Sequence, residues 1–206
     1  MLTKQTDIAA QISSRICHDL ISPIGAISNG LELLALSGAP LSPELTLINE
    51  SVDAANAKLR FLRIAFGGAK SNSKVAASEI TNILHDYYND PRTQLNWLIE
   101  TAMERRDLRL LFLILLSAEK LAPYGAQITV AHKTADFTIT LVAKTLKTDG
   151  FLDLPSHRFP PQDSPPLIQF TLAQTQLDQM GYTMQLSETP DNLTITITPR
   201  IRINRS

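Results

Sequence analysis

The segment RICHDLISP places a histidine and an aspartate side by side, at His18 and Asp19, within a pattern typical of a long helix. On a helical wheel at about 100° per residue, His18 lies on the polar side, roughly opposite the apolar stripe. An exposed neutral imidazole is a nucleophile near neutral pH, and a neighbouring carboxylate can orient a ring nitrogen or accept its proton. The residues around His18 on this face are small and leave room for a partner: Ser14, Ser22, Gly25 and Asn29.

The residues around His18 are also compatible with less specific interpretations. A histidine on an exposed helix face is most often simply solvated, and this interpretation stays open. Ser22 is not flanked by the glycine-containing turn that carries a hydrolase nucleophile. No metal site is predicted, because the remaining histidines fall in separate segments without ligand spacing: His85, His132 and His157.

Two helices are predicted to position this segment. Apolar residues recur every three, four or seven positions between Asp7 and Leu36, which predicts a helix that Pro23 should bend. Ser42-Pro43 predicts the N-cap and first position of a second helix, which extends to Phe66. Gly67-Gly68 is predicted to form a left-handed C-terminal cap. Residues 1–68 are therefore expected to form a helical hairpin domain.

The hairpin is predicted to dimerise. Each helix carries an apolar stripe about 100° wide and has only one neighbour to cover it. A second copy of the chain would supply two more helices, which predicts a homodimer built as an intermolecular four-helix bundle. Phe61 and Ile64 lie away from the stripe of the second helix, so they are expected to pack against the rest of the chain.

The fold class predicted for the whole chain is α+β. Residues 69–75 are small and polar, which indicates a linker. Residues 76–206 are expected to form an α/β sandwich, with helices on one side of a mixed sheet. The helices are predicted at 79–89, 104–121 and 167–180, and the strands at 94–99, 127–132, 136–143, 182–187 and 193–198.

Composition narrows the class of function. The chain has 206 residues and a net charge of −1, so no overall basic field attracts nucleic acid or an anionic membrane. The single Cys17 excludes an intrachain disulfide, and the first residues do not have the pattern of a signal peptide. No membrane span is predicted, and the location expected is the cytoplasm.

The run HDLISPIGAISNGLELL, from His18 to Leu34, resembles the phosphoacceptor box of two-component histidine kinases. More closely, the whole chain resembles the ChpT histidine phosphotransferases of alphaproteobacteria. This resemblance implies that the hairpin dimerises and that His18 carries a phosphoryl group between receiver domains. It implies a CckA-like hybrid kinase as donor, and CtrA-like and CpdR-like response regulators as acceptors. It also implies that the sandwich is a degenerate histidine-kinase ATP-binding domain of the GHKL (Bergerat) type.

The motifs with which such kinases hold Mg²⁺-ATP are not found in this sequence. Ser117 stands where the resemblance places the metal-binding asparagine, and Lys144–Gly150 contains no Asp-x-Gly-x-Gly. Residues 151–166 contain five prolines and no glycine, and proline cannot supply the amide donors of a phosphate-binding loop. We therefore expect no cofactor and no metal of the protein's own, with Mg²⁺ supplied by the partner receiver.

Further residues are predicted to contact the receiver. In an antiparallel hairpin with its turn near residue 40, position 18 lies level with positions 60 to 62, so Arg60 and Arg63 could flank a phosphoryl group. Ser14, Arg15, Ile21, Ser22 and Gly25 complete the predicted docking surface around His18 and Asp19. Two alternatives stay open: an atypical ATP-dependent histidine kinase, and a dimeric scaffold without catalytic function.

Overall fold

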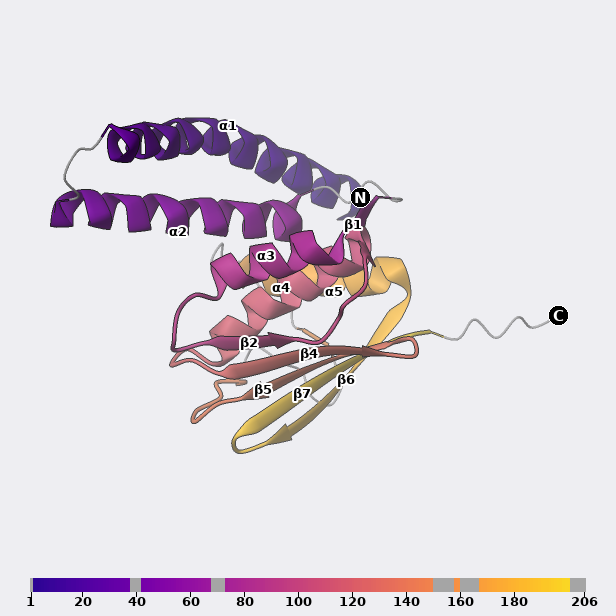
Figure 1. The fold of residues 1–206 in the computed structure, drawn as a ribbon. Coiled ribbons are helices and arrows are strands. Elements are labelled where there is room, and N and C mark those ends of the chain that lie inside the picture. Colours follow the sequence, from indigo (N-terminus) through magenta and orange to yellow (C-terminus); the bar gives the residue numbers. More distant parts are fainter. Residues whose placement is uncertain (1, 38–41, 68–72, 150–157, 160–166, 201–206) are drawn as a thin grey trace.

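The computed structural model describes residues 2–37, 42–67, 73–149, 158–159 and 167–200 (Figure 1). Within α1, the side chains of residues 2–15, 17 and 18 also lie outside the described part. The chain forms a helical hairpin that lies against the helices of an α/β sandwich (Figure 1). This arrangement agrees with the α+β fold class expected from the sequence.

The hairpin consists of α1 (Leu2–Leu36) and α2 (Pro43–Phe66). α1 continues through Pro23 and curves along its length (Figure 1). Ser42 is the N-cap of α2, as predicted: its hydroxyl accepts a hydrogen bond from the Leu45 N–H at 3.3 Å. Position 18 lies on the stretch of α1 beside the C-terminal half of α2.

The predicted left-handed cap at the end of α2 is wrong at Gly67. Its backbone is extended, with φ −68° and ψ 161°, and its N–H donates to the Arg63 carbonyl at 3.2 Å. Glycine is required here for another reason, because a Cβ at this position would collide with that same carbonyl. Gly68 lies outside the described residues.

The sandwich is a five-stranded sheet with helices on one face (Figure 1). Its strands are β2 (Gln94–Trp97), β4 (Gln127–Lys133), β5 (Asp136–Val142), β7 (Asn192–Pro199) and β6 (Tyr182–Thr189), in that spatial order. β2 pairs with β4 in parallel, and the other pairs are antiparallel. The covering helices are α3 (Ala77–Tyr87), α4 (Arg105–Leu121) and α5 (Ile168–Met180).

The strand patterns explain which face of the sheet is covered. In β7, Leu193, Ile195 and Ile197 are fully buried, while the alternating threonines are only partly buried. A period of two is expected when one face packs on a core. α5 ends at Gly181, whose left-handed backbone (φ 67°) turns the chain directly into β6.

A two-stranded sheet not predicted from the sequence joins the two parts of the chain. β1 (Lys74–Val75) falls in the predicted linker and pairs antiparallel with β3 (Met103–Glu104). Val75 is buried, and the Arg105 N–H donates to the Ser73 carbonyl at 2.8 Å. The end of the predicted linker is therefore held against the start of α4.

The hairpin and the sandwich share a core through α2. Phe61, Ile64 and Ala65 are fully buried, which confirms that Phe61 and Ile64 pack against the rest of the chain. Phe61 stacks on Phe112 of α4 at 4.4 Å and on Tyr87 of α3 at 4.0 Å between ring centroids. The α2 backbone is thus anchored directly on the helical layer of the sandwich.

One buried cation also connects α2, α4 and α5. The Arg109 side chain donates from Nε to the Ala65 carbonyl at 3.2 Å and from Nη1 to Gln176 Oε1 at 2.7 Å. Burial lowers the pKa of Arg109. Both of these acceptors are uncharged, so the hydrogen bonds offset part of the cost of burying the guanidinium.

Candidate functional site

Most of the described side chains in the α1 segment around His18 face solvent, while Ile21 is partly buried. Asp19, Leu20, Ser22 and Pro23 are exposed. The side chains of the predicted residues Ser14, Arg15 and His18 lie outside the described residues. The backbone nevertheless places position 18 within the continuous helix α1. The exposed residues that follow it are not covered by the sandwich, so a partner could reach them.

Space for a partner is also present at Gly25. Among the described residues, a Cβ placed here would meet no atom within 4 Å apart from the neighbouring backbone of α1. Ile21 and Gly25 are partly buried, unlike the exposed Ser22 between them. A larger side chain at position 25 would therefore project from α1 without disturbing the packing of this chain.

An apolar stripe of α1 is exposed along the same helix. Ile16, Leu20, Ile27 and Leu34 expose between 44% and 53% of their surface. Their spacings of four and seven place them on one side of the helix. On α2, Ile48 is also 45% exposed. The hairpin therefore leaves apolar surface uncovered in a single copy of the chain.

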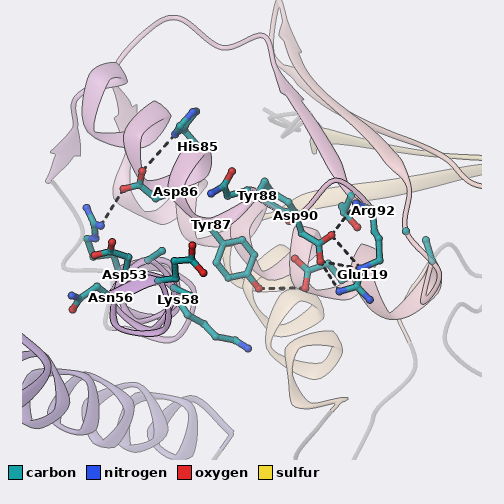
Figure 2. Close-up of a pocket in the computed structure, with 18 of the residues that line it drawn as sticks. Asp53, Asn56, Lys58, His85, Asp86, Tyr87, Tyr88, Asp90, Arg92 and Glu119 are labelled. Carbon is teal, nitrogen blue, oxygen red and sulfur yellow. Dashed lines mark hydrogen bonds and ion pairs between the residues drawn. The ribbon is translucent and has the colours of Figure 1, made fainter. Parts of the chain in front are cut away.

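Beside the hairpin lies an open cleft of about 1140 Å³ (Figure 2). Ile21 and Ser28 of α1 line one part of it, and the sandwich side is formed by α3, the loop that follows it and the end of α4. Ile21 lies about one helical turn after position 18, so the cleft begins about one turn along α1 from the predicted phosphoacceptor.

Arg60, one of the two predicted basic contacts, lines the cleft and binds the sandwich. Its Nη2 lies 3.1 Å from Asp86 Oδ2 on α3. Asp86 Oδ1 lies in turn 3.5 Å from Nδ1 of His85, whose side chain is 82% exposed (Figure 2). Arg63 is exposed in the last turn of α2.

Two tyrosines and a carboxylate form the inner wall of the cleft (Figure 2). The Tyr87 hydroxyl donates to Glu119 Oε2 at 3.3 Å, while the Tyr88 hydroxyl and Glu119 Oε1 are buried without a hydrogen-bond partner. Burial raises the pKa of Glu119, and the Tyr87 hydroxyl and Lys58 oppose that effect. Burial and the neighbouring Glu119 raise the pKa of both tyrosines.

Asp90 and Arg92 form an ion pair on the loop that completes the cleft wall. Hydrogen bonds from the Arg92 side chain and backbone lower the pKa of Asp90 to about 2. The loop is packed closely on Gly125, where a Cβ would collide with the Arg92 carbonyl. Gly125 has φ 100°, which favours glycine.

Ser117 and Phe159, in two of the segments where the sequence lacks nucleotide-binding motifs, are both buried. Ser117 is completely buried, and its hydroxyl donates to the Leu113 carbonyl of the same helix at 2.9 Å. Phe159 is buried against Phe170, and its N–H donates to Gln174 Oε1 at 3.1 Å. Within the part of the chain that the structure describes, no three histidine, cysteine or acidic side chains gather as a possible metal site.

Sequence reasoning missed the acidic residues of the cleft. Glu119 follows the apolar run of α4, and its burial arises from contacts with α3 that periodicity does not reveal. Asp86 had a local signal, because His85-Asp86 repeats the dipeptide found at His18-Asp19. The pairing of Asp86 with Arg60 depends on how α2 packs against α3, and only the structure gives it.

Comparisons with known proteins agree with the expected family. Residues 77–192 match the model of the histidine phosphotransferase C-terminal domain. The chain is 35% identical over 161 residues to the protein phosphotransferase ChpT of Brucella abortus (strain 2308), covering 75% of this chain and 77% of that protein. A solved structure of a bacterial phosphotransferase superposes with a TM-score of 0.62 at 27% identity, over 89% of this chain and 92% of the other.

Proposed function

Because this chain belongs to the ChpT family of histidine phosphotransferases, we propose that it relays phosphoryl groups between receiver domains through His18. A ring nitrogen of His18 attacks the phosphorus of an aspartyl phosphate, forming a P–N bond as the P–O bond to the aspartate breaks. In the second transfer, the aspartate of another receiver attacks the same phosphorus and His18 leaves. Neither transfer requires an oxidant or a reductant.

The observation that carries this proposal is the open face of α1 around position 18. Asp19 and Ser22 are exposed, and Gly25 has free space above it. A donor that is itself a protein must bring its aspartyl phosphate within contact distance of the nucleophile, so such a face is needed. Asp19 would orient the imidazole or manage its proton, and Ser14, Arg15, Ile21 and Arg63 would add to the docking surface.

The chemistry proposed requires no nucleotide or metal held by this chain. The receiver would supply Mg²⁺, which neutralises the charge that develops on the transferring group. Ser117 is buried and its hydroxyl donates to the Leu113 carbonyl, so it is not directed at a bound metal. This supports the proposal that Mg²⁺ comes from the receiver. The partners we propose are CckA-like hybrid kinases and CtrA-like and CpdR-like regulators, in the cytoplasm.

We also propose that two copies of the hairpin form a four-helix bundle. The exposed stripe of Ile16, Leu20, Ile27 and Leu34 supports this, since a second hairpin would remove it from water. A symmetric pairing would use the same stripe on both copies. The open face around position 18 lies on the opposite side of α1 and would stay accessible.

A membrane is the other apolar environment for this helix. Asp19–Leu36 is long and apolar enough to cross a bilayer by length and composition. However, Asp19 and Glu32 lie within this segment, and Ser22, Ser28 and Asn29 lie on the side away from the stripe. A spanning helix would bring all of these into lipid, whereas a bundle leaves that side in water. The one-sided pattern therefore favours a second copy.

The experiment that tests the proposal compares two phosphoryl donors. The purified chain is incubated with a ³²P-phosphorylated receiver of a cognate hybrid kinase, or with labelled ATP and Mg²⁺ alone. We expect acid-labile, base-stable label on this chain from the receiver only. Label from ATP alone would favour the atypical kinase, and the absence of label from the receiver would favour a scaffold.

A further inference from the structure

The ion pair between Arg60 and Asp86 connects the phosphoacceptor hairpin to the sandwich across the cleft. Arg60 belongs to α2 and Asp86 to α3, and their nitrogen and oxygen atoms lie 3.1 Å apart. The two side chains are 45% and 37% exposed. The His85 imidazole provides a second contact to Asp86, at 3.5 Å. Asp86 therefore holds Arg60 on the sandwich side of the hairpin and contacts His85 at the same time.

Arg60 is also level with the phosphoacceptor. α1 ends at Leu36 and α2 begins at Pro43, and both helices rise about 1.5 Å per residue, so position 18 is level with positions 60 to 62. Ile21, one turn after position 18, lines the same cleft as Arg60. A phosphoryl group carried at position 18 would therefore lie at the level of Arg60 along the hairpin.

The Asp86 carboxylate and a phosphoryl group on His18 would differ in how strongly they bind the Arg60 guanidinium. An exposed ion pair in water holds its side chains weakly. A phosphoryl group brings a charge of about −2 near neutral pH and three acceptor oxygens, and guanidinium binds such groups with two parallel hydrogen bonds. Phosphorylation of His18 would thus compete with Asp86 for the same cation.

We propose that Asp86 is a positioning residue that competes with the phosphoryl group on His18 for Arg60. In the unphosphorylated chain, the ion pair with Asp86 holds Arg60 at the level of position 18 along the hairpin. In the phosphorylated chain, Arg60 interacts in part with Asp86 and in part with the phosphoryl group on His18. This inference rests on the proposed function, because it requires phosphohistidine at position 18. It assigns the contact between α2 and α3 a role in the reaction beyond packing.

The test measures the electrostatic environment of the phosphoryl group directly. The full chain is phosphorylated with potassium phosphoramidate, a small donor that transfers its phosphoryl group to imidazole nitrogen with loss of ammonia and needs no receiver docking. The ³¹P signal absent from His18→Ala is then titrated with pH. A guanidinium near the phosphoryl group lowers its pKa by favouring the dianion.

We expect Arg60→Ala to raise that pKa and Asp86→Asn to lower it, because Arg60 is then no longer shared. The size expected is about two- to fivefold in the acid dissociation constant, since an exposed pair is weak. In the Arg60→Ala background, Asp86→Asn should have no effect. Asp90→Asn is the matched control, because it removes the ion pair with Arg92 on the same cleft and should leave the titration unchanged.

Several results would overturn the inference. One is an Asp86→Asn effect that persists without Arg60, and another is an equal effect from Asp90→Asn. Identical titrations in all variants would also overturn it, and would leave the phosphotransfer role itself intact. Failure of the proposed function would give a different result. The wild-type chain would then accept no label from a phosphorylated receiver, even if phosphoramidate phosphorylates His18.

Discussion

Substitution of Ile27 by aspartate should separate the proposed dimer. Ile27 is 50% exposed at the centre of the α1 stripe, so a partner hairpin would bury about half of its side chain. Full burial of an isoleucine contributes about 1.5 to 3 kcal/mol, so half contributes about 1 kcal/mol. A twofold interface contains each residue twice, which makes the loss about 2 kcal/mol per dimer before the cost of burying two carboxylates.

A loss of about 2 kcal/mol corresponds to a roughly 30-fold weaker dissociation constant. Sedimentation equilibrium at several micromolar concentrations measures it. The matched control is Asn29→Asp, which adds the same charge on the opposite, exposed side of α1 and should leave association unchanged. A wild-type chain that is monomeric at micromolar concentration, or an Ile27→Asp chain that associates as tightly as wild type, would refute the reasoning.

Three further substitutions test the packing of α2 on the sandwich, the buried carboxyl of Glu119 and the docking surface around His18. Phe61→Ala removes a ring stacked between Tyr87 and Phe112, and urea denaturation should show a loss of about 3 to 5 kcal/mol; a loss under 1 kcal/mol would contradict the shared core. Burial raises the pKa of Glu119 above 4.5, so its contribution to stability is present below pH 4.5 and is lost as pH rises through the folded-state pKa. Glu119→Gln should therefore flatten the decline of unfolding free energy as pH rises above 4.5, and an unchanged slope would contradict the raised pKa of Glu119. Gly25→Trp should block transfer from a receiver with an unchanged melting temperature, because no described atom beyond the backbone of α1 itself lies within 4 Å of its Cβ position; normal transfer would place docking elsewhere.

The elements of the fold were predictable because their signals are local. Every predicted helix and strand of the sandwich is present, with ends shifted by one or two residues. Ser42 and Pro43 predicted the start of α2 because a cap is a contact between near neighbours. The burial of Phe61 and Ile64 followed from their place outside the stripe of α2.

Contacts between distant segments could not be predicted in this way. The sequence predicts a linker at Lys74 and Val75, and these residues form a strand because β3 lies beside them. The conformation of Gly67 depends on how closely the chain passes the Arg63 carbonyl. The ion pair of Arg60 with Asp86 requires the packing of α2 on α3, which no periodicity encodes.

The identity of the phosphoacceptor is the central claim, and His85 is the natural competitor. It is exposed and also has an aspartate next to it, with Nδ1 3.5 Å from Asp86 Oδ1. Transfer from a ³²P-labelled receiver to wild type, His18→Ala and His85→Ala, each with its melting temperature measured, decides between them. We predict no base-stable label on His18→Ala, normal label on His85→Ala, and unchanged stability in both. Substitution of an exposed residue such as His85 usually alters stability by under about 0.5 kcal/mol. Label that persists on a folded His18→Ala chain would contradict the assignment.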